Sequence, residues 1–390
     1  MPYVYRNFRS WPRTLRTLIY PARQKNQEWD SPDISNYLAG RRPCRSIHHG
    51  PSEKTAVIPG LEAVAKDHYI AQTYLKHFGD SAAGGMLHAH RKADGSNFDC
   101  WPKDVCHEWD GDLNSVIADR PELLGDYRKI FEKQWNPSIT NILAGQISAN
   151  DKFVVAAYMA NMMVCTPAWR RVAESTMAQH ALGTLSFADE MKKKHGVKDE
   201  MLAEGLAMIE RGAMSLEVDP DHVKALLTRQ LLTHACITYN LDWWVVENET
   251  DQPFLTSDNP VAMLYSGRPA DPVTRILPIT PRLCLSVTYD PITATRFSLK
   301  DVPRVLKSPP AGRITRAKAR PVSVRTANRL VAQCAENLVF SSRPEDEGAA
   351  DLVKKYGRYR LEAEYVEFPA KDPPGARIQG TIVSVREKAH

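Results

Sequence analysis

The stretch PFLTSDNPV, residues 253–261, places an acid, an amide and two hydroxyl side chains next to one another. Asp258 and Asn259 are the candidate catalytic residues, because a carboxylate can orient a base or bind a metal and an amide can donate to a phosphate oxygen. Thr256 and Ser257 are the supporting candidates. Asn259 precedes a proline, which keeps its backbone extended and excludes a helix. The same residues also suit an Asx-type turn at a strand end, so a structural turn and a catalytic carboxylate both remain open.

A second candidate is the pair His68 and Gln72, four residues apart in HYIAQTYLKHF. On a helix the two share a face and border the apolar stripe, where polar groups without partners would be costly. Imidazole titrates near neutral pH, so His68 suits general acid or base catalysis, with Gln72 positioning it. The alternative is a structural pair that ties the helix to a loop. His234 lies in line with Leu227 and Leu231 and is interpreted as a core histidine.

A metal candidate lies in MLHAHRK, where His88 and His90 would point to the same side of a strand. Cys100, Cys106 and His107 follow closely, and imidazole and thiolate are ligands that zinc prefers. The segment lacks the CxxC pair of a zinc ribbon or finger. Surface histidines beside loop thiols are therefore the favoured alternative. For cofactors the sequence leaves two possibilities, none or a divalent metal.

Basic residues gather in two stretches of a chain whose net charge is only +5. Residues 1–50 carry nine Lys or Arg against three acids, and residues 304–329 carry eight basic residues and no acid. Such stretches attract polyanions such as nucleic acid. A solvated arm and a solvated loop are the alternative. The candidate anion-binding side chains are Arg170, Arg171, Arg313, Arg316, Lys318 and Arg320.

The order of periodic segments predicts an α+β fold, with a helix-rich N-terminal half, a strand-rich C-terminal half and one further helix. Residues 1–52 are basic, contain prolines and are predicted to form an extended arm. The core is expected over 53–345, helical over 60–240 and strand-rich over 241–345. Residues 346–390 are expected to be an extension with short strands.

Apolar spacing, caps and prolines predict the individual elements of this core. Asp219 followed by Pro220 is a strong helix start, and RLCLSVTYD alternates as a strand. WWVVEN and PFLTS are expected to pair as strands across a polar turn. The remaining expected helices cover HYIAQTYLKHF, 121–135, 137–145, a buried segment from about 150 that breaks at Pro167, 187–212, and 328–338.

Several classes of protein are made less probable by what the sequence lacks. No apolar run is long enough to span a bilayer, and the first residues have no secretory h-region, so no membrane association is expected. The seven cysteines are odd in number and mostly lie in apolar or widely spaced positions, which favours a reducing cytoplasm. An Arg-rich start also resembles an organelle transit peptide, which is the alternative location. The phosphate loop, the GxSxG elbow and the GxGxxG fingerprint are absent, which argues against three common enzyme classes.

Three segments, HYIAQTYLKHF, PFLTSDNPV and ILPITPRLCLSV, resemble the signature blocks of the domain-of-unknown-function family numbered 4238, over about residues 66–343. CTPAWRR and NRLVAQCAENLVFSS are similar to weaker blocks of that family. The resemblance singles out His68, Gln72 and residues 256–260, and it implies no particular reaction. The chain departs from the family pattern at Ala71, where proline is usual, and in CHEWDGD, where a tyrosine is common.

Together these features favour a hydrolase that acts on nucleic acid, a ribonuclease-like effector. In this hypothesis His68, Asp258 and Asn259 carry the reaction, and the basic residues hold the phosphate backbone. The alternative is a non-enzymatic protein that binds nucleic acid or a protein partner. A minor alternative is a metal-dependent enzyme that uses His88 and His90.

Overall fold

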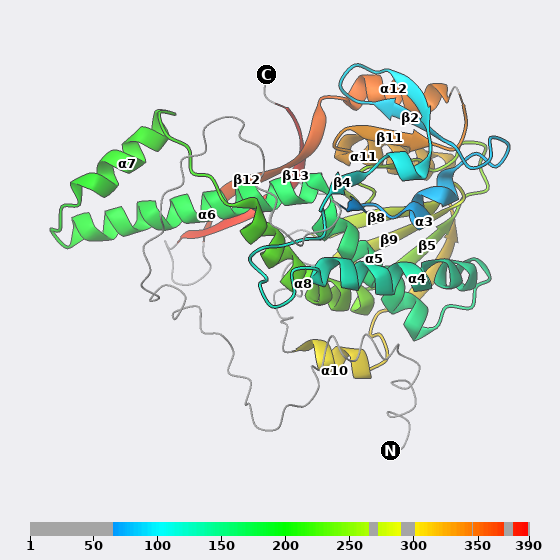
Figure 1. The fold of residues 1–390 in the computed structure, drawn as a ribbon, viewed down its shortest axis with the longest axis horizontal. Helices are drawn as coiled ribbons and strands as arrows, with labels where there is room; N and C mark the ends of the chain where they lie inside the picture. The colour runs from blue at the N-terminus through cyan, green and yellow to red at the C-terminus, as the bar shows by residue number, and fades with distance from the viewer. Residues whose placement is uncertain (1–64, 265–271, 290–300, 345, 370–376, 389–390) are drawn as a thin grey trace.

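The computed structural model describes residues 65–264, 272–289, 301–344, 346–369 and 377–388. Within these ranges long helices occupy the middle of the chain, and most of the strands follow them (Figure 1). The predicted α+β class is therefore confirmed. The predicted arm over residues 1–52 lies outside the described residues.

The helical region consists of successive long helices. The buried helix begins at a capping box, in which the Ser148 hydroxyl and the Asp151 carboxylate each satisfy a backbone N–H of the other's residue. It ends before Pro167, which starts the next helix because a proline at the first helical position removes no needed hydrogen bond. The helices are α4 (Leu123–Leu143), α5 (Ala149–Cys165), α6 (Pro167–Lys194), α7 (Glu200–Glu210) and α8 (Pro220–Asn240).

Two of the predicted helices are one. We predicted separate helices over 121–135 and 137–145, but α4 runs through Pro137 without a break. A proline inside a helix costs one backbone hydrogen bond. Here tertiary packing offsets that cost, because Trp135 and Ile139, on either side of Pro137, are both buried. In contrast, the start of α8 at Pro220 with the Asp219 carboxylate as N-cap is as predicted.

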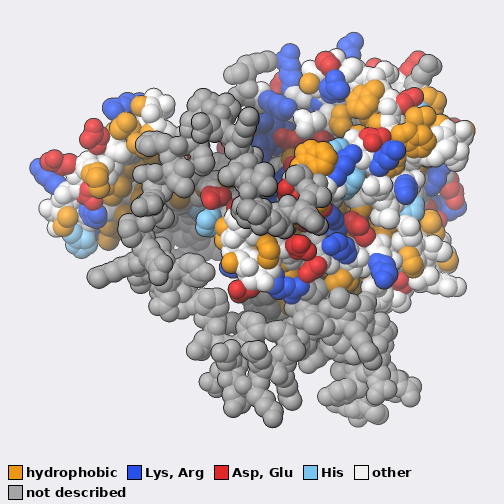
Figure 2. Space-filling model, in the orientation of Figure 1, with side chains coloured by type: hydrophobic (Ala, Val, Ile, Leu, Met, Phe, Trp, Pro, Cys, Tyr) orange, Lys and Arg blue, Asp and Glu red, His pale blue; other side chains and the backbone are white. Residues whose placement is uncertain are grey.

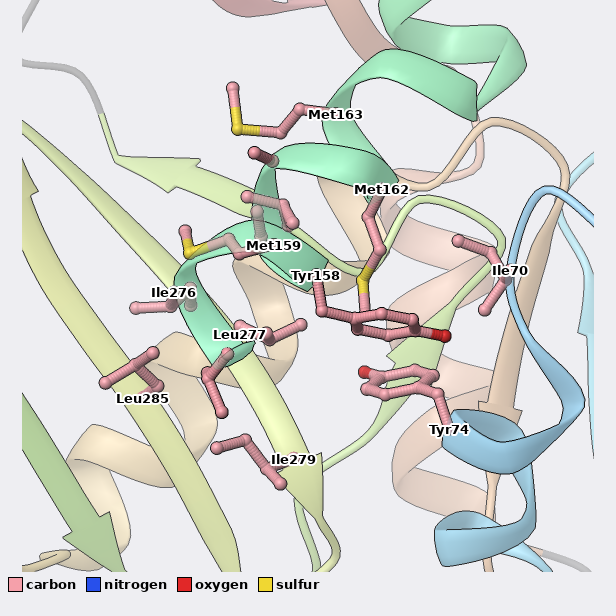
Figure 3. Close-up of a cluster of buried hydrophobic side chains, with 14 of the residues drawn as sticks. Ile70, Tyr74, Tyr158, Met159, Met162, Met163, Ile276, Leu277, Ile279 and Leu285 are labelled. Carbon is pink, nitrogen blue, oxygen red and sulfur yellow. The ribbon is translucent and has the colours of Figure 1, made fainter. Parts of the chain in front are cut away.

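A five-stranded sheet packs against these helices, in the strand order β10-β5-β9-β8-β7. All its neighbouring strands are antiparallel except the edge strand β10, which runs parallel to β5. Its strands are β5 (Trp243–Glu247), β7 (Ala262–Leu264), β8 (Val273–Thr280), β9 (Leu283–Tyr289) and β10 (Ile314–Lys318). Figure 3 shows Met159 of α5 lying beside Ile276 and Leu277 of this sheet, so helix and sheet share one core.

A second, four-stranded sheet has the order β3-β2-β11-β6, with strands β2 (Leu87–Arg91), β3 (Asn97–Cys100), β6 (Thr256–Ser257) and β11 (Leu338–Ser341). The predicted pairing of WWVVEN with PFLTS is wrong, because β5 belongs to the first sheet and β6 to the second. β6 pairs instead with β11, eighty residues further along. The chain therefore crosses between the sheets at the segment that precedes PFLTSDNPV.

The first family-like block forms a strand before it forms a helix. β1 (Lys66–His68) pairs antiparallel with β4 (His107–Trp109), and His68 faces His107 in the register. Only then does α3 (Gln72–Leu75) begin, followed by the 3-10 turns η2 (Lys76–Phe78) and, later, η3 (Pro102–Asp104). Our prediction of one continuous helix from His68 is therefore wrong, although Tyr74, Leu75 and Phe78 are buried as the apolar spacing indicated.

The C-terminal part contains more helix than predicted. The further helix, expected over 328–338, is α11 (Pro321–Cys334), and it begins at a proline whose starting role the sequence analysis missed. Two others flank it, α10 (Val302–Lys307) and α12 (Glu347–Tyr356). Residues 346–390 form α12 and two paired strands of eleven residues each, β12 (Tyr359–Pro369) and β13 (Arg377–Glu387), rather than short strands.

β12 is fastened to the rest of the molecule through its main chain. One edge of β12 pairs with β13. Alternate carbonyl oxygens accept hydrogen bonds from core side chains: Tyr359 O from Lys92 at 2.6 Å, Leu361 O from Arg171 at 2.9 Å and Ala363 O from Gln179 at 3.2 Å. The two-residue spacing is that of one edge of a strand. Core side chains thus occupy the edge that β13 leaves free.

Candidate functional site

The turn that carries Asp258 is completely enclosed. It leaves β6 and enters β7, and Asp258 is only 2 % exposed. Its carboxylate accepts three backbone N–H groups: Oδ1 from Glu336 at 2.9 Å, and Oδ2 from Asn337 at 2.7 Å and Leu338 at 3.1 Å. These donors belong to the connection between α11 and β11. Asp258 therefore holds the connection between α11 and β11 against the end of β6, in the second sheet.

The electrostatics of Asp258 fit this arrangement. Burial raises the pKa of its carboxyl group, while the three backbone donors and the nearby Lys92 ammonium act to lower it. Lys92 in turn donates to Ala335 O at 2.6 Å, within the same connection. The geometry favours the structural alternative for Asp258, because its oxygens already serve three main-chain donors and no face of the side chain is open to a substrate.

Asn259 and its neighbours also serve the core. The Asn259 amide donates to Cys334 O at 2.8 Å, and its oxygen accepts from the Thr166 hydroxyl at 3.2 Å. It therefore joins the end of α11 to the junction of α5 and α6. Thr256 is hydrogen-bonded to the Tyr74 hydroxyl at 2.7 Å, and the Ser257 hydroxyl accepts the Asn259 N–H at 3.2 Å. The catalytic role predicted for Asn259, and the supporting roles of Thr256 and Ser257, find no open site here.

His68 lies in a different setting. It is half-buried at the end of β1, and its Nε2 is 3.1 Å from Lys103 O and 3.5 Å from the Gln72 amide nitrogen. Burial is the main cause that lowers the pKa of His68, and the neighbouring His107, Lys66 and Arg128 lower it further. Its backbone oxygen accepts from Arg128 at 2.7 Å. His68 is therefore a neutral imidazole on a fixed backbone at neutral pH.

His68 opens into a pocket of about 280 Å3. The pocket lies between β1, the start of α3 and one side of α4. Glu132 of α4 is on its wall, and burial raises the pKa of that carboxyl group, with Asp112 adding to the rise and Arg128 opposing it. A base with a lowered pKa and an acid with a raised pKa thus share one pocket. The wall also contains Lys66, Gln72, Lys76 and Arg128.

Arg128 ties this pocket to a buried group of acids. Its guanidinium contacts Asp112 at 2.5 Å, Asp67 at 3.4 Å and Glu132 at 3.4 Å. Burial raises the pKa of Asp112 to about 6. Burial also raises the pKa of Glu132, so Asp112 and Glu132 hold protons more readily than exposed carboxyl groups do. The sequence analysis missed both Arg128 and Glu132, although their four-residue spacing on a helix was a readable sign that they interact.

His68 and Asp258 do not share a hydrogen bond. Those of His68 go to Lys103 and Gln72, whereas those of Asp258 go to the main chain of residues 336–338. Tyr69 follows His68 in the chain; burial is the main cause that raises its pKa, and Cys106 and then Asp258 add to the rise. The structure thus brings His68 and Gln72 together, and it encloses Asp258 against the main chain of residues 336–338.

The metal candidates are buried rather than exposed. His88 and His90 are 7 % and 2 % exposed, so the expectation of surface histidines is wrong. His88 Nδ1 is 2.6 Å from the Asp99 carboxylate, and neither ring nitrogen of His90 has a hydrogen-bond partner. Across the described ranges, no group of three or more His, Cys, Asp or Glu side chains is arranged to hold a metal ion.

Most of the predicted anion-binding side chains already have acidic partners. Arg170 pairs with Glu108, and Arg171 with Glu336 at 2.8 Å. Figure 2 shows the same mixture on one face, where Lys and Arg lie among Asp and Glu. On β10, Arg316 pairs with Glu247, Lys318 with Glu249 at 2.8 Å and Arg313 with Asp242 at 4.0 Å, while Arg320 is exposed and makes no ion pair with a described residue.

No helix in the described ranges is long and apolar enough to cross a membrane. The fold and the enclosed turn define an α+β protein in which a buried Ser-Asp-Asn segment leads from the four-stranded sheet to the five-stranded sheet. The family model described as "Protein of unknown function (DUF4238)" matches residues 66–345, and the chain belongs to that family. The suspected membership is therefore confirmed. No curated protein and no solved structure matches the chain.

Proposed function

We propose that this chain is a hydrolase that acts on phosphodiester bonds of nucleic acid, with its active site in the His68 pocket. One observation carries the proposal: His68, with a lowered pKa, and Glu132, with a raised pKa, line the same pocket. Burial biases both groups toward their neutral forms, an imidazole that can accept a proton and a carboxyl group that can donate one, and these are the forms that a general base and a general acid need. The reaction assigned earlier to Asp258 and Asn259 is not part of this proposal.

The two groups divide the proton transfers between them. Lys103 O is an acceptor, so the His68 nitrogen facing it carries a hydrogen, and Nδ1 keeps a free lone pair. Nδ1 takes a proton from a water molecule as its oxygen attacks phosphorus. Protonated Glu132 gives a proton to the leaving oxygen as the P–O bond breaks. Gln72 acts as a positioning residue by packing its amide against the ring, 3.5 Å from Nε2, without donating to that protonated nitrogen.

Cations on the wall favour an anionic substrate. Lys66 and Lys76 bring two positive charges to the pocket, and the charge of its one carboxyl group, Glu132, is offset by its ion pair with Arg128. At about 280 Å3 the pocket is slightly smaller than sites for drug-sized ligands, which span about 300–1,000 Å3. It therefore suits one phosphate group with part of a sugar, as in a nucleic-acid chain that continues over the surface.

The test is hydrolysis of structured RNA, single-stranded DNA and duplex DNA, with and without EDTA. His68→Ala and Glu132→Gln should each lower the rate by about 10²–10⁴-fold, the usual contribution of a general acid or base. The matched control is His77→Ala, a histidine on the next turn that is hydrogen-bonded to Asn136 and does not line the pocket. Equal rates for His68→Ala and His77→Ala would refute the assignment.

The second candidate is a non-enzymatic protein that binds nucleic acid or a protein partner. The enclosed Asp258 turn favours it, because the most distinctive motif then holds the two sheets together and carries no chemistry. Salt-sensitive binding that survives His68→Ala, with no product from any substrate, would select this candidate. For either function we propose a cytoplasmic location, which is supported by the six described cysteines, all free thiols in buried positions.

A further inference from the structure

Arg275 is a buried cation that has no counter-ion among the described residues. It lies on β8, is 8 % exposed, and its guanidinium is 4.5 Å from the centre of the Tyr289 ring. Among the described residues it forms no ion pair and donates no hydrogen bond, and its Nε is completely covered without a partner. A ring face offsets only part of the cost of removing a guanidinium from water.

A second basic group with a covered, unpartnered nitrogen is His234 of α8, whose Nδ1 has no hydrogen-bond partner. Burial lowers the pKa of His234, and the charge of Arg275 lowers it further, so the two groups lie within electrostatic range of each other. Both can act as donors, and neither has an acceptor among the described residues.

Two other buried cations of this chain, Lys152 and Lys92, do have hydrogen-bond acceptors. Lys152 is fully buried, and it donates to Leu241 O at 2.9 Å and to Gly312 O at 2.7 Å. Lys92 donates to Ala335 O and Tyr359 O, each at 2.6 Å. In both cases backbone carbonyls replace the lost water. Arg275 is buried to a similar degree without such acceptors, so its guanidinium needs an acceptor from another source.

We propose that Arg275 and His234 form a binding site for a small oxyanion, a carboxylate or a phosphate group. A guanidinium that lies over an aromatic ring keeps its edge free, and that edge matches two oxygens of an oxyanion. Of its nitrogens only Nε is completely covered, so the terminal nitrogens still reach solvent. His234 adds a third donor. The site is separate from the His68 pocket, since neither residue lines that pocket.

The first experiment follows thermal unfolding of the full chain while acetate or inorganic phosphate is added, with chloride at equal ionic strength as the reference. The melting temperature of the unaltered protein should rise and then saturate with one of the two anions, because a ligand that binds only the folded state stabilises it. The anion that acts identifies the ligand as carboxylate or phosphate. No rise beyond chloride with either anion would overturn the proposal.

Variants test whether the rise in melting temperature comes from an anion bound at Arg275. Arg275→Met keeps the length of the side chain, and anion affinity should fall at least about tenfold, the ratio that corresponds to losing one hydrogen bond to a charged group. Arg229→Met is the matched control, because Arg229 is an exposed arginine on α8, and it should bind like the unaltered protein. If Arg275→Met does not fold, His234→Leu replaces it, with a smaller but measurable loss expected.

The His68 pocket also carries cations, so its contribution is measured separately. Lys76→Ala removes a pocket cation and should leave the saturable rise in melting temperature unchanged. A rise that is lost in Lys76→Ala and kept in Arg275→Met would assign the anion to the His68 pocket and overturn this inference, without bearing on whether that pocket is catalytic.

Discussion

Replacing Asp258 with alanine tests whether the motif that is most distinctive in the sequence is structural. The substitution removes the acceptor for three part-buried backbone donors, the N–H groups of residues 336–338. Each such donor left without a partner costs about 1–3 kcal/mol, so Asp258→Ala should lower the free energy of unfolding by about 3–9 kcal/mol. That is a large part of the about 5–15 kcal/mol by which a folded protein is usually stable.

Two companion variants make the number interpretable. Asp258→Asn keeps one acceptor oxygen but turns an N–H₂ group toward backbone donors. Its decrease in the free energy of unfolding should therefore lie between zero and that of the alanine variant. Asp94 accepts the backbone N–H and the hydroxyl of Ser96 in an exposed loop, where water replaces a lost acceptor. Asp94→Ala should therefore change the stability by less than about 1 kcal/mol.

Urea unfolding gives these values, because the buried Trp135 and Trp243 report the loss of the core by fluorescence. Circular dichroism at the same urea concentrations tests whether unfolding is two-state. An Asp258→Ala protein as stable as Asp94→Ala would refute the argument, since the three donors would then have found other acceptors. If that stable protein also lost hydrolysis, the catalytic interpretation of Asp258 would return.

Three further predictions concern single positions. A Cβ at Gly312 would lie 2.0 Å from Leu241 O, so Gly312→Ala should lower the melting temperature strongly, whereas Gly205→Ala, which meets open space, should raise it slightly on a helix. Burial lowers the pKa of His234 to about 4, so stability should fall by up to about 3 kcal/mol as the pH drops from 6.5 to 4, and urea unfolding of His234→Leu in buffers without oxyanions should lack that fall. Tyr74→Phe removes hydrogen bonds to Thr256 and to a backbone oxygen and should cost about 1–3 kcal/mol in urea unfolding, with unchanged circular dichroism.

Local signals in the sequence predicted much of the fold. The start of α8, the break between α5 and α6 and the alternation of β9 depend on neighbouring residues, and all three are found. The errors arise where contacts with distant parts of the chain determine the secondary structure or the strand pairing. β6 pairs with a strand eighty residues away, and α4 continues through Pro137 because both flanking residues are packed, and neither fact is encoded locally.

The candidate site was predictable only in part for the same reason. The family-like block pointed to His68 and Gln72, which do lie together at a pocket. Glu132 and Arg128 join them from a helix sixty residues later, and the sequence alone does not say which face of α4 meets β1. Asp258 was singled out on the same grounds as His68, but an acid of a signature motif can serve the main chain as well as a substrate, and only its partners distinguish the two.

The edge of β12 bears on how this family can diversify. Residues 66–345 carry the family match, yet Lys92 and Arg171 within them hold a strand that lies beyond it. Lys92 and Arg171 donate hydrogen bonds to backbone carbonyl oxygens, which every amino acid supplies. Apart from Leu361, which is buried in the core, and Glu362, which pairs with Arg171, substitutions along β12 can therefore accumulate while the attachment survives. A segment can thus be structurally constant and still escape sequence comparison. Relatives that retain the lysine, the arginine and an apolar residue at the position of Leu361 are expected to retain a docked strand there.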